Sequence, residues 1–234
     1  MDWLASAALN NAFSDTGSGI LGEKDGTAIF DALLQRQNGM QTLANQFLQT
    51  GIDHYLAKSY PQAAQSFEAA VSLAPNSAYN VESSQYLVQS YLQLDKTDKA
   101  IDTYKAAIKR NPDRDDLSAA LGKLYYAEER YEEAAAQYRS AVQVNPGATN
   151  RYAYGEALLK VKNFTEAEHQ FREVKRLEPS SHVADYGLGK LCAQQHDFDN
   201  AIAHFERALA LEPTFYDALA ESGFTHADKG DIEK

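Results

Sequence analysis

The sequence predicts an all-α protein built from pairs of helices that stack side by side. Five of its six prolines recur at separations of 33 to 37 residues. Small and aromatic residues stand at fixed distances before these prolines, and apolar residues between them follow the three- and four-residue spacing of one helix face. With 234 residues, of which 44% are hydrophobic, the chain is long enough to bury the core that such a stack requires.

Each recurring proline closes a similar segment. These prolines are Pro75, Pro112, Pro146, Pro179 and Pro213. An alanine lies twelve residues before each, at Ala63, Ala100, Ala134, Ala167 and Ala201. An aromatic residue lies eight residues before each, at Phe67, Tyr104, Tyr138, Phe171 and Phe205. Because proline lacks the amide that a continuing helix needs and disfavours helical geometry in the residue before it, we expect a helix to end at each proline.

Apolar residues form two helical faces within each segment. In the third segment the first face consists of Leu117, Ala120, Leu121, Leu124 and Tyr125. The second face consists of Ala134, Ala135, Tyr138, Ala141 and Val142. The small residues allow the two helices to approach closely, and the aromatic ring fills the space beside them. Neither helix can bury its apolar face alone, so neighbouring pairs are expected to stack.

These columns resemble the tetratricopeptide repeat, a helix-turn-helix unit of about 34 residues with small and aromatic residues at fixed positions before a closing proline. Earlier in its unit the family has an apolar, a small and an aromatic residue. Leu121, Gly122 and Tyr125 match this pattern, whereas the fifth segment has Cys192 at the aromatic position. The resemblance implies an all-α, right-handed superhelical solenoid of helix-turn-helix repeats (an α-α superhelix).

The repeat columns divide the chain into three parts. Residues 1–43 precede the repeats, and the five full units are 44–77, 81–114, 115–148, 148–181 and 182–215. Residues 216–234 are expected to form the first helix of a sixth, truncated unit. Because this last segment keeps the apolar Leu219, Phe224 and Ile232 of an internal unit, we expect the chain to be a fragment of a longer protein.

The part before the repeats has two interpretations. Residues 3–13 and 29–34 are compatible with helices, and residues 14–19 have the composition of a loop. Residues 1–43 could be a degenerate leading helix pair that caps the first repeat. Alternatively, they could be an arm that docks into the groove of a neighbouring molecule and causes self-assembly.

The resemblance also implies where a partner binds. In tetratricopeptide arrays the first helix of each unit lines the concave side. The matching positions predict a peptide-binding groove of Tyr55, Gln85, Tyr86, Gln89, Lys123, Tyr126, Tyr152, Glu156, Tyr186, Lys190 and Phe224, with Leu48, Ile52 and Glu82 among the other positions on this side. Tyrosine recurs among them, and its apolar ring with one hydrogen-bonding group suits the holding of a partner segment.

The charged groove positions indicate the chemistry of the partner. Acidic residues outnumber basic ones at these positions, which favours a mixed or slightly basic peptide with apolar anchors. One subgroup of the family holds the C-terminal carboxylate of chaperones with lysine, asparagine and arginine residues from three consecutive units. Lys123 and Lys190 stand two units apart with Glu156 between them, so we do not expect this activity.

Composition excludes several classes of partner. The formal net charge of −11 repels the phosphates of nucleic acids and anionic lipid surfaces. No apolar run approaches the roughly 20 residues that span a bilayer. The amino end lacks the basic residues of a signal peptide, so we expect a cytoplasmic protein without nucleic-acid binding or membrane insertion.

No motif predicts an enzyme. Residues 17–22 have the G-x-G-x-x-G pattern of dinucleotide-binding folds, but neither the strand before it nor the helix after it is expected here. The histidines lack the spacing of a zinc site, and Cys192 stands in a helix-packing column. We therefore expect no catalytic residue, no cofactor and no metal.

The sequence predicts a non-enzymatic protein–protein interaction scaffold that binds a partner peptide or helix in its groove. Two alternatives remain open. The chain could be an interaction or regulatory domain of a longer, possibly enzymatic, protein. It could also be a self-assembling structural protein, a homo-oligomer formed through residues 1–43.

Overall fold

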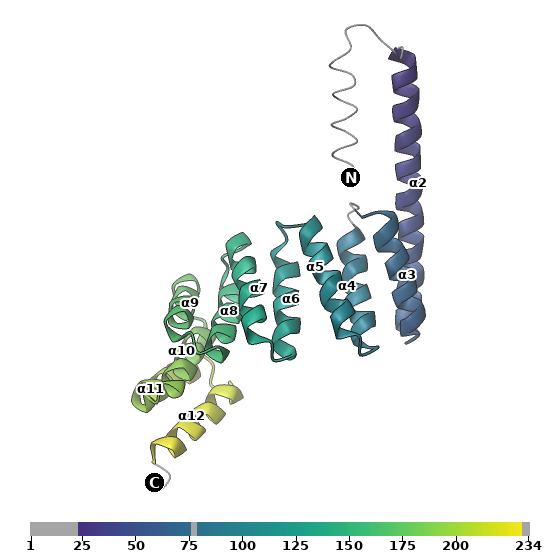
Figure 1. Cartoon of the computed structure of the whole chain (residues 1–234). Helices are drawn as coiled ribbons and strands as arrows, with labels where there is room; N and C mark the ends of the chain where they lie inside the picture. The colour runs from purple at the N-terminus through teal and green to yellow at the C-terminus, as the bar shows by residue number, and fades with distance from the viewer. Residues whose placement is uncertain (1–22, 76–78, 231–234) are drawn as a thin grey trace. The chain divides into compact units, whose positions relative to one another are not determined.

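The computed structural model describes residues 23–75 and 79–230, and the side chains of its first helix from residue 30 onward. Within these ranges it contains eleven helices and no strand, so the all-α prediction is confirmed (Figure 1). The helices are α2 (Glu23–Leu56), α3 (Tyr60–Leu73), α4 (Tyr79–Leu92), α5 (Thr97–Arg110), α6 (Asp115–Ala127), α7 (Tyr131–Val144), α8 (Ala148–Lys160), α9 (Phe164–Leu177), α10 (His182–Gln194), α11 (Phe198–Leu211) and α12 (Tyr216–Lys229).

The chain forms two compact units, residues 1–86 and residues 87–234. In the first unit, α2 packs against α3. In the second unit, each helix from α5 to α12 packs against the next one along the chain (Figure 1). The first helices of successive pairs also meet there, because α10 contacts both α8 and α12.

The second helix of each pair ends just before its proline. α3 ends two residues before Pro75, and the residue between them, Ala74, has φ −134° and ψ 67°. Glu178 has φ −130° and ψ 77° at the end of α9. This backbone lies outside the helical region because the ring of the following proline crowds it. The ends of α5, α7 and α11 have similar geometry.

The turn inside each pair contains one residue in the left-handed conformation. These residues are Lys58, Asp95, Glu129, Lys162 and His196, with φ between 55° and 62°. Each donates its backbone N–H to the carbonyl oxygen three residues earlier, at 2.9 to 3.2 Å. A side chain other than hydrogen costs energy in this conformation. The packing of the two helices therefore imposes the turn on these residues.

The alanine and aromatic columns form the core between paired helices. All five column alanines are fully buried, as are Phe67, Phe171 and Phe205. Glycines of the first helices face these rings. A Cβ atom placed on Gly155 would lie 2.6 Å from the ring of Phe171. Because a real Cβ atom cannot come so close, only glycine allows this approach.

Helix α2 differs most from the expected organisation. It runs without a break from Glu23 to Leu56, so the boundary placed at 43/44 falls inside it. Its residues from 30 to 43 are exposed, and burial begins at Ala44. Residues 3–13 and the glycine-rich 17–22 lie outside the described residues, so the capping or arm role of residues 1–43 stays a prediction. A helix does follow residues 17–22, contrary to the expectation for that motif.

Candidate functional site

The predicted groove residues fall into both compact units. Tyr55, Gln85 and Tyr86 belong to the first unit. The second unit contains Gln89, Lys123, Tyr126, Tyr152, Glu156, Tyr186, Lys190 and Phe224.

In the first unit the aromatic groove residues are joined to the core. The ring of Tyr86 stacks on Phe67 with a centroid distance of 5.4 Å. Tyr55 lies edge-on to Tyr86 at 5.9 Å and to Tyr60 at 5.5 Å. Tyr55 and Tyr86 are half-buried, as is Gln85. Each tyrosine therefore contributes part of its surface to packing and leaves part accessible.

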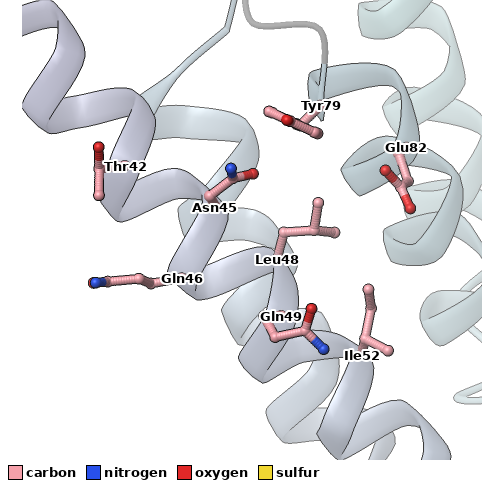
Figure 2. Close-up of a pocket in the computed structure, with 8 residues that line it drawn as sticks. All are labelled: Thr42, Asn45, Gln46, Leu48, Gln49, Ile52, Tyr79 and Glu82. Carbon is pink, nitrogen blue, oxygen red and sulfur yellow. The ribbon is translucent and has the colours of Figure 1, made fainter.

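A cavity of about 500 Å³ in the first unit is lined by residues of α2 and by Tyr79 and Glu82 at the start of α4. Figure 2 shows Leu48 and Ile52 turned toward the space between the two helices, with Asn45, Gln49, Tyr79 and Glu82 around them. Thr42 and Gln46 complete the lining. The cavity thus combines an apolar floor with a rim of carboxamides, one carboxylate and one phenol.

Several lining residues of this cavity were not predicted. Asn45 and Gln49 lie on the same face of α2 as Leu48 and Ile52, three or four residues away, so helical periodicity alone could have found them. Both are polar, whereas the residues predicted on α2, Leu48, Ile52 and Tyr55, are apolar or aromatic. Thr42 precedes the expected boundary at 43/44 but lies in the same continuous helix α2 as Leu48 and Ile52.

In the second unit a half-buried ion pair connects two first helices. The Lys190 ammonium of α10 donates a hydrogen bond to Oε2 of Glu156 in α8. Only 19% and 17% of these side chains are exposed. The other carboxylate oxygen, Oε1 of Glu156, is buried and accepts no hydrogen bond of ordinary geometry within the described residues. The Lys190 ammonium also lies 5.2 Å from the ring centroid of Tyr186.

The negative charge of Glu156 acts on three nearby tyrosines. Burial, with the neighbouring Glu156 carboxylate, raises the pKa of Tyr126 to about 12. Burial and Glu156 also raise the pKa of Tyr152 above its usual value. Burial and the carboxylates of Glu221 and Asp217 raise the pKa of Tyr186. The phenols therefore stay protonated at neutral pH and can donate hydrogen bonds.

The exposure of the predicted groove residues in this unit varies widely. Gln89, Lys123 and Phe224 are exposed, and Tyr126 is half-buried. Tyr152 instead packs against the core formed by α8, α9 and α10, with its ring 5.7 Å from that of Phe171. Tyr186 lies 4.8 Å from the ring of Phe215. These two tyrosines therefore have a packing role as well as a place on the surface.

A second charged cluster forms around Asp185 of α10. Only 3% of this side chain is exposed. Its carboxylate accepts hydrogen bonds from Lys175 Nζ at 2.9 Å and from Arg207 Nε at 3.3 Å, and its Oδ1 lies 2.9 Å from His204 Nδ1. The cluster joins α10 to α9 and α11, and we interpret it as structural.

The described residues show no arrangement typical of catalysis. Burial raises the pKa of the half-buried Cys192 thiol, which keeps it protonated. Within the described ranges no three His, Cys, Asp or Glu side chains gather in a way that could hold a metal ion. None of the helices in these ranges combines the length and apolarity that crossing a membrane requires.

The stacked helix pairs match a known family. A family model for the tetratricopeptide repeat matches residues 87–149, and a second model for the same repeat matches residues 186–215. The chain is a tetratricopeptide repeat protein. Both matches fall in the second unit, where the alanine, aromatic and glycine columns are most regular.

Known proteins are similar to this tetratricopeptide repeat protein in sequence or in fold. It is 35% identical over 98 residues to the human protein O-mannosyl-transferase TMTC2, a match that covers 40% of this chain and 12% of that protein. The chain thus spans a small part of the relative's length. A tetratricopeptide repeat protein from Parabacteroides merdae superposes with a TM-score of 0.71 at 17% identity, covering 81% of this chain and 74% of the other. YrrB, described as a tetratricopeptide repeat protein with an unusual peptide-binding site, superposes with a TM-score of 0.60 at 20% identity, covering 78% of this chain and 90% of its own.

Proposed function

We propose that this tetratricopeptide repeat protein is a non-enzymatic scaffold that binds a segment of a partner protein on its first helices. The observation that carries the proposal is the cavity between α2 and α4, where an apolar floor is rimmed by polar groups (Figure 2). Carboxamides can donate to and accept from the backbone of an extended peptide, while an apolar side chain of that peptide covers Leu48 and Ile52. The peptide-binding site reported for YrrB gives this interpretation additional support.

The partner segment is expected to carry basic and apolar residues. Residues 1–86 contain eight acidic and three basic side chains, so the first unit attracts cations. Glu82 at the rim of the cavity makes no ion pair with another described residue. A lysine or arginine of the partner could pair with Glu82 while its aliphatic stem covers the apolar floor.

Selection from a random peptide library tests the proposal. Twelve-residue peptides displayed on phage are selected on the immobilised chain, and the enriched peptides are titrated in solution. We expect enriched peptides to place a lysine or arginine beside an apolar residue. The double variant Gln49→Ala, Glu82→Gln should weaken their binding by about tenfold or more, because it removes rim groups without changing the floor.

Two further variants make the library experiment decisive. Asp53→Asn with Gln62→Ala is the matched control, because both residues are exposed and lie outside the cavity. Lys123→Ala with Tyr126→Ala examines the surface of the second unit. A library that yields no binders, or binders that respond to neither variant more than to the control, would contradict the scaffold proposal.

Self-assembly is a second candidate because of the exposed apolar residues on α2. Phe30 is 58% exposed, and Leu33, Leu34, Met40 and Leu43 are also exposed. Such a face can be covered by another molecule. Light scattering of the full chain and of the variant Leu33→Lys, Leu34→Lys measures this. A larger mass that the variant abolishes supports assembly, and a monomer in both cases rules it out.

A role within a longer protein is favoured by the match to TMTC2, of which this chain covers only 12%. In that case the repeats would recognise a partner or regulate the longer protein, and a separate domain would carry any enzymatic activity. Immunoblotting of the native organism with an antibody against this chain tests the idea. A band of the size of 234 residues contradicts it, and a much larger band supports it.

A further inference from the structure

Two successive helix pairs of the second unit carry a polar cluster at the same repeat positions. The clusters stand 34 residues apart and consist of Arg151, Gln170 and Glu173 in the pair α8 and α9, and of Asp185, His204 and Arg207 in the pair α10 and α11. In both clusters the residue of the first helix contacts side chains of the second helix of its own pair. The two clusters can therefore be compared position by position.

In the earlier cluster the charges are balanced. Arg151 donates a hydrogen bond to Oε1 of Gln170 at 2.8 Å and lies 3.9 Å from the carboxylate of Glu173. Arg176 and Glu166, which bond to Glu173 and Gln170, add one charge of each sign. Only 16% of the Arg151 side chain and 23% of the Glu173 side chain are exposed. A balanced set of charges is therefore sufficient to join the two helices at this place in the repeat.

The later cluster has more cations than anions. Lys175 Nζ, His204 Nδ1 and Arg207 Nε all lie within 3.3 Å of the same atom, Oδ1 of Asp185. Lys175 has no charged counterpart in the earlier cluster, because Ala141 stands 34 residues before it. Two permanent positive charges thus meet one negative charge. The cluster keeps a net positive charge even when His204 is neutral.

Neighbouring side chains do not remove this excess charge. Burial lowers the pKa of His204, Asp185 raises it, and Arg207 and Lys175 lower it, so the cluster itself supplies the main charges around this ring. Positions one turn away from Arg207 on α11 are alanine, leucine or His204. On α9, Glu178 lies one turn after Lys175, but it is exposed and the Lys175 ammonium pairs with Asp185 instead.

Several donor groups of the cluster are open to a ligand. Arg207 is 51% exposed, and it bonds to Asp185 through Nε, so its two Nη groups have no hydrogen-bond partner among the described residues. Lys175 is 41% exposed and has a third N–H beyond the two that reach Asp185. Asp185 is only 3% exposed, so it orients these side chains from their buried side. Such preorganisation lowers the entropic cost of binding.

We infer that Lys175, His204 and Arg207, held by Asp185, form a binding site for the dianion of a phosphate monoester. This site is distinct from the cavity lined by α2 and α4. The guanidinium fork of Arg207 can bond two phosphate oxygens, and the Lys175 ammonium supplies a compact charge. The chain carries a net charge of −11, but charges farther away than about 8 Å are largely screened at physiological ionic strength, so the local excess of cations decides.

The charge and shape of the ligand follow from the donors. A phosphate monoester carries a charge of about −1.5 to −2 at pH 7 and has three acceptor oxygens, which match donors from two helices. A carboxylate has one charge and two oxygens, so it would engage fewer of them. The monoester can belong to a small phosphate compound or to a phosphorylated side chain of a partner, and the experiment separates these two sources.

Titration of the full ¹⁵N-labelled chain with inorganic phosphate tests the site. At constant ionic strength we expect saturable chemical-shift changes at the Arg207 Nε–H and at the amides of residues 203–207. Acetate should bind at least about fivefold more weakly. A capped glycine–phosphoserine–glycine peptide is the second probe. Tighter binding of this peptide than of the free ion identifies a phosphorylated side chain as the source, and the reverse order identifies a small phosphate compound.

Charge-neutralising variants of the full chain complete the experiment. Arg207→Gln and Lys175→Gln should each weaken phosphate binding by about tenfold, because each removes a charged donor. Arg139→Gln is the matched control, since Arg139 is an exposed arginine of the second helix α7 outside the cluster and should bind like the unchanged chain. Circular dichroism checks that all three variants fold.

Three results would overturn the inference. The first is the absence of saturable shifts at the cluster. The second is equal binding of acetate and phosphate, and the third is an equal effect of Arg139→Gln and of the two cluster variants. Because the probes are anions and the α2 and α4 cavity is expected to take basic and apolar residues, failure here leaves the scaffold proposal to its own test.

Discussion

Glycine at the helix contacts illustrates how one residue type has opposite energetic roles in this chain. A glycine inside a helix normally reduces stability relative to alanine, because it loses more conformational freedom on folding. At Gly155 a glycine is nevertheless needed, because the ring of Phe171 occupies the space that a side chain would fill. At Gly223 no such neighbour is present in the described residues.

The two glycines should therefore respond oppositely to alanine. We expect Gly155→Ala to lower the free energy of unfolding by about 1–3 kcal/mol, because the added methyl group overpacks against the Phe171 ring. Gly223→Ala should raise it by up to about 1 kcal/mol through higher helix propensity. Urea unfolding followed by circular dichroism measures both. Equal effects in the two variants would mean that the ring contact does not control the site.

The Asp185 cluster shows that a single residue can connect three helices. Burial alone would raise the pKa of this carboxyl, but hydrogen bonds from Lys175 and His204 hold it below its usual value. Burial lowers the pKa of His204, although its hydrogen bond to Asp185 acts in the opposite direction. Both groups therefore bind fewer protons in the folded state than in the unfolded state, so stability falls as the pH is lowered.

This linkage predicts a pH-dependent effect of Asp185→Asn. At neutral pH the variant should lose about 1–3 kcal/mol of stability, because a buried charge-assisted hydrogen-bond network is broken. His204 makes the unchanged chain less stable below about pH 6.5, and Asp185 adds a further loss below about pH 4. The difference between the two proteins should therefore shrink below about pH 4.

Thermal unfolding between pH 3.5 and 7.5 measures this difference. Asp199→Asn is the control, because Asp199 forms an ion pair with Lys229 while 83% of its side chain is exposed. That variant should change stability by less than about 0.5 kcal/mol. A loss in Asp185→Asn that does not vary with pH would show that the charge of the carboxylate is not responsible.

At the scale of the helix pair, the turn is the least favourable local structure. Its left-handed residue is Lys, Asp, Glu or His in every pair, although glycine adopts this conformation without steric cost. The turns nevertheless form, because pairing of the two helices buries the alanine and aromatic columns. Tertiary packing thus overrides local preference at the same position of five hairpins.

Replacing a turn residue by glycine should stabilise the hairpin. We expect Glu129→Gly to raise the free energy of unfolding by about 0.5–1 kcal/mol, because it relieves the left-handed strain between α6 and α7. Glu132→Gly, three residues later inside α7, should lower it by about 1 kcal/mol. Urea titration compares the two. A loss of stability in Glu129→Gly would show that its side chain matters more than its backbone.

At the largest scale, the stability of the second unit is distributed along a series of helix contacts. Each helix from α5 to α12 contacts the next one along the chain, and α10 also contacts α8 and α12. Helices packed on two sides, such as α9 between α8 and α10, have most of their apolar surface covered. α12 packs against α10 and α11 and leaves Tyr216, Leu219 and Phe224 exposed.

Within the second unit, hydrogen exchange should be slower in helices that are packed on two sides than in α12. We expect the backbone amides of α9 to exchange most slowly and those of α12 considerably faster, because α12 opens without disturbing other pairs. Mass spectrometry of peptic fragments after deuterium labelling measures the rates. If α12 were as protected as α9, its exposed face would have to be covered in solution, which would point to self-association through that face.

The sequence by itself determined the all-α class, the ends of the second helices and the buried alanine and aromatic columns. These features depend on local chemistry, on the missing amide of proline and on periodic spacing, all of which can be recognised without coordinates. Tertiary structure alone decided that Tyr152 packs against the core formed by α8, α9 and α10, that Lys190 pairs with Glu156 from the preceding repeat, and that α2 continues through residue 44. The first two outcomes depend on contacts between different helices, which the spacing of residues along one helix does not reveal. The third occurs where the repeat pattern is weak, so the spacing could not place the start of the helix.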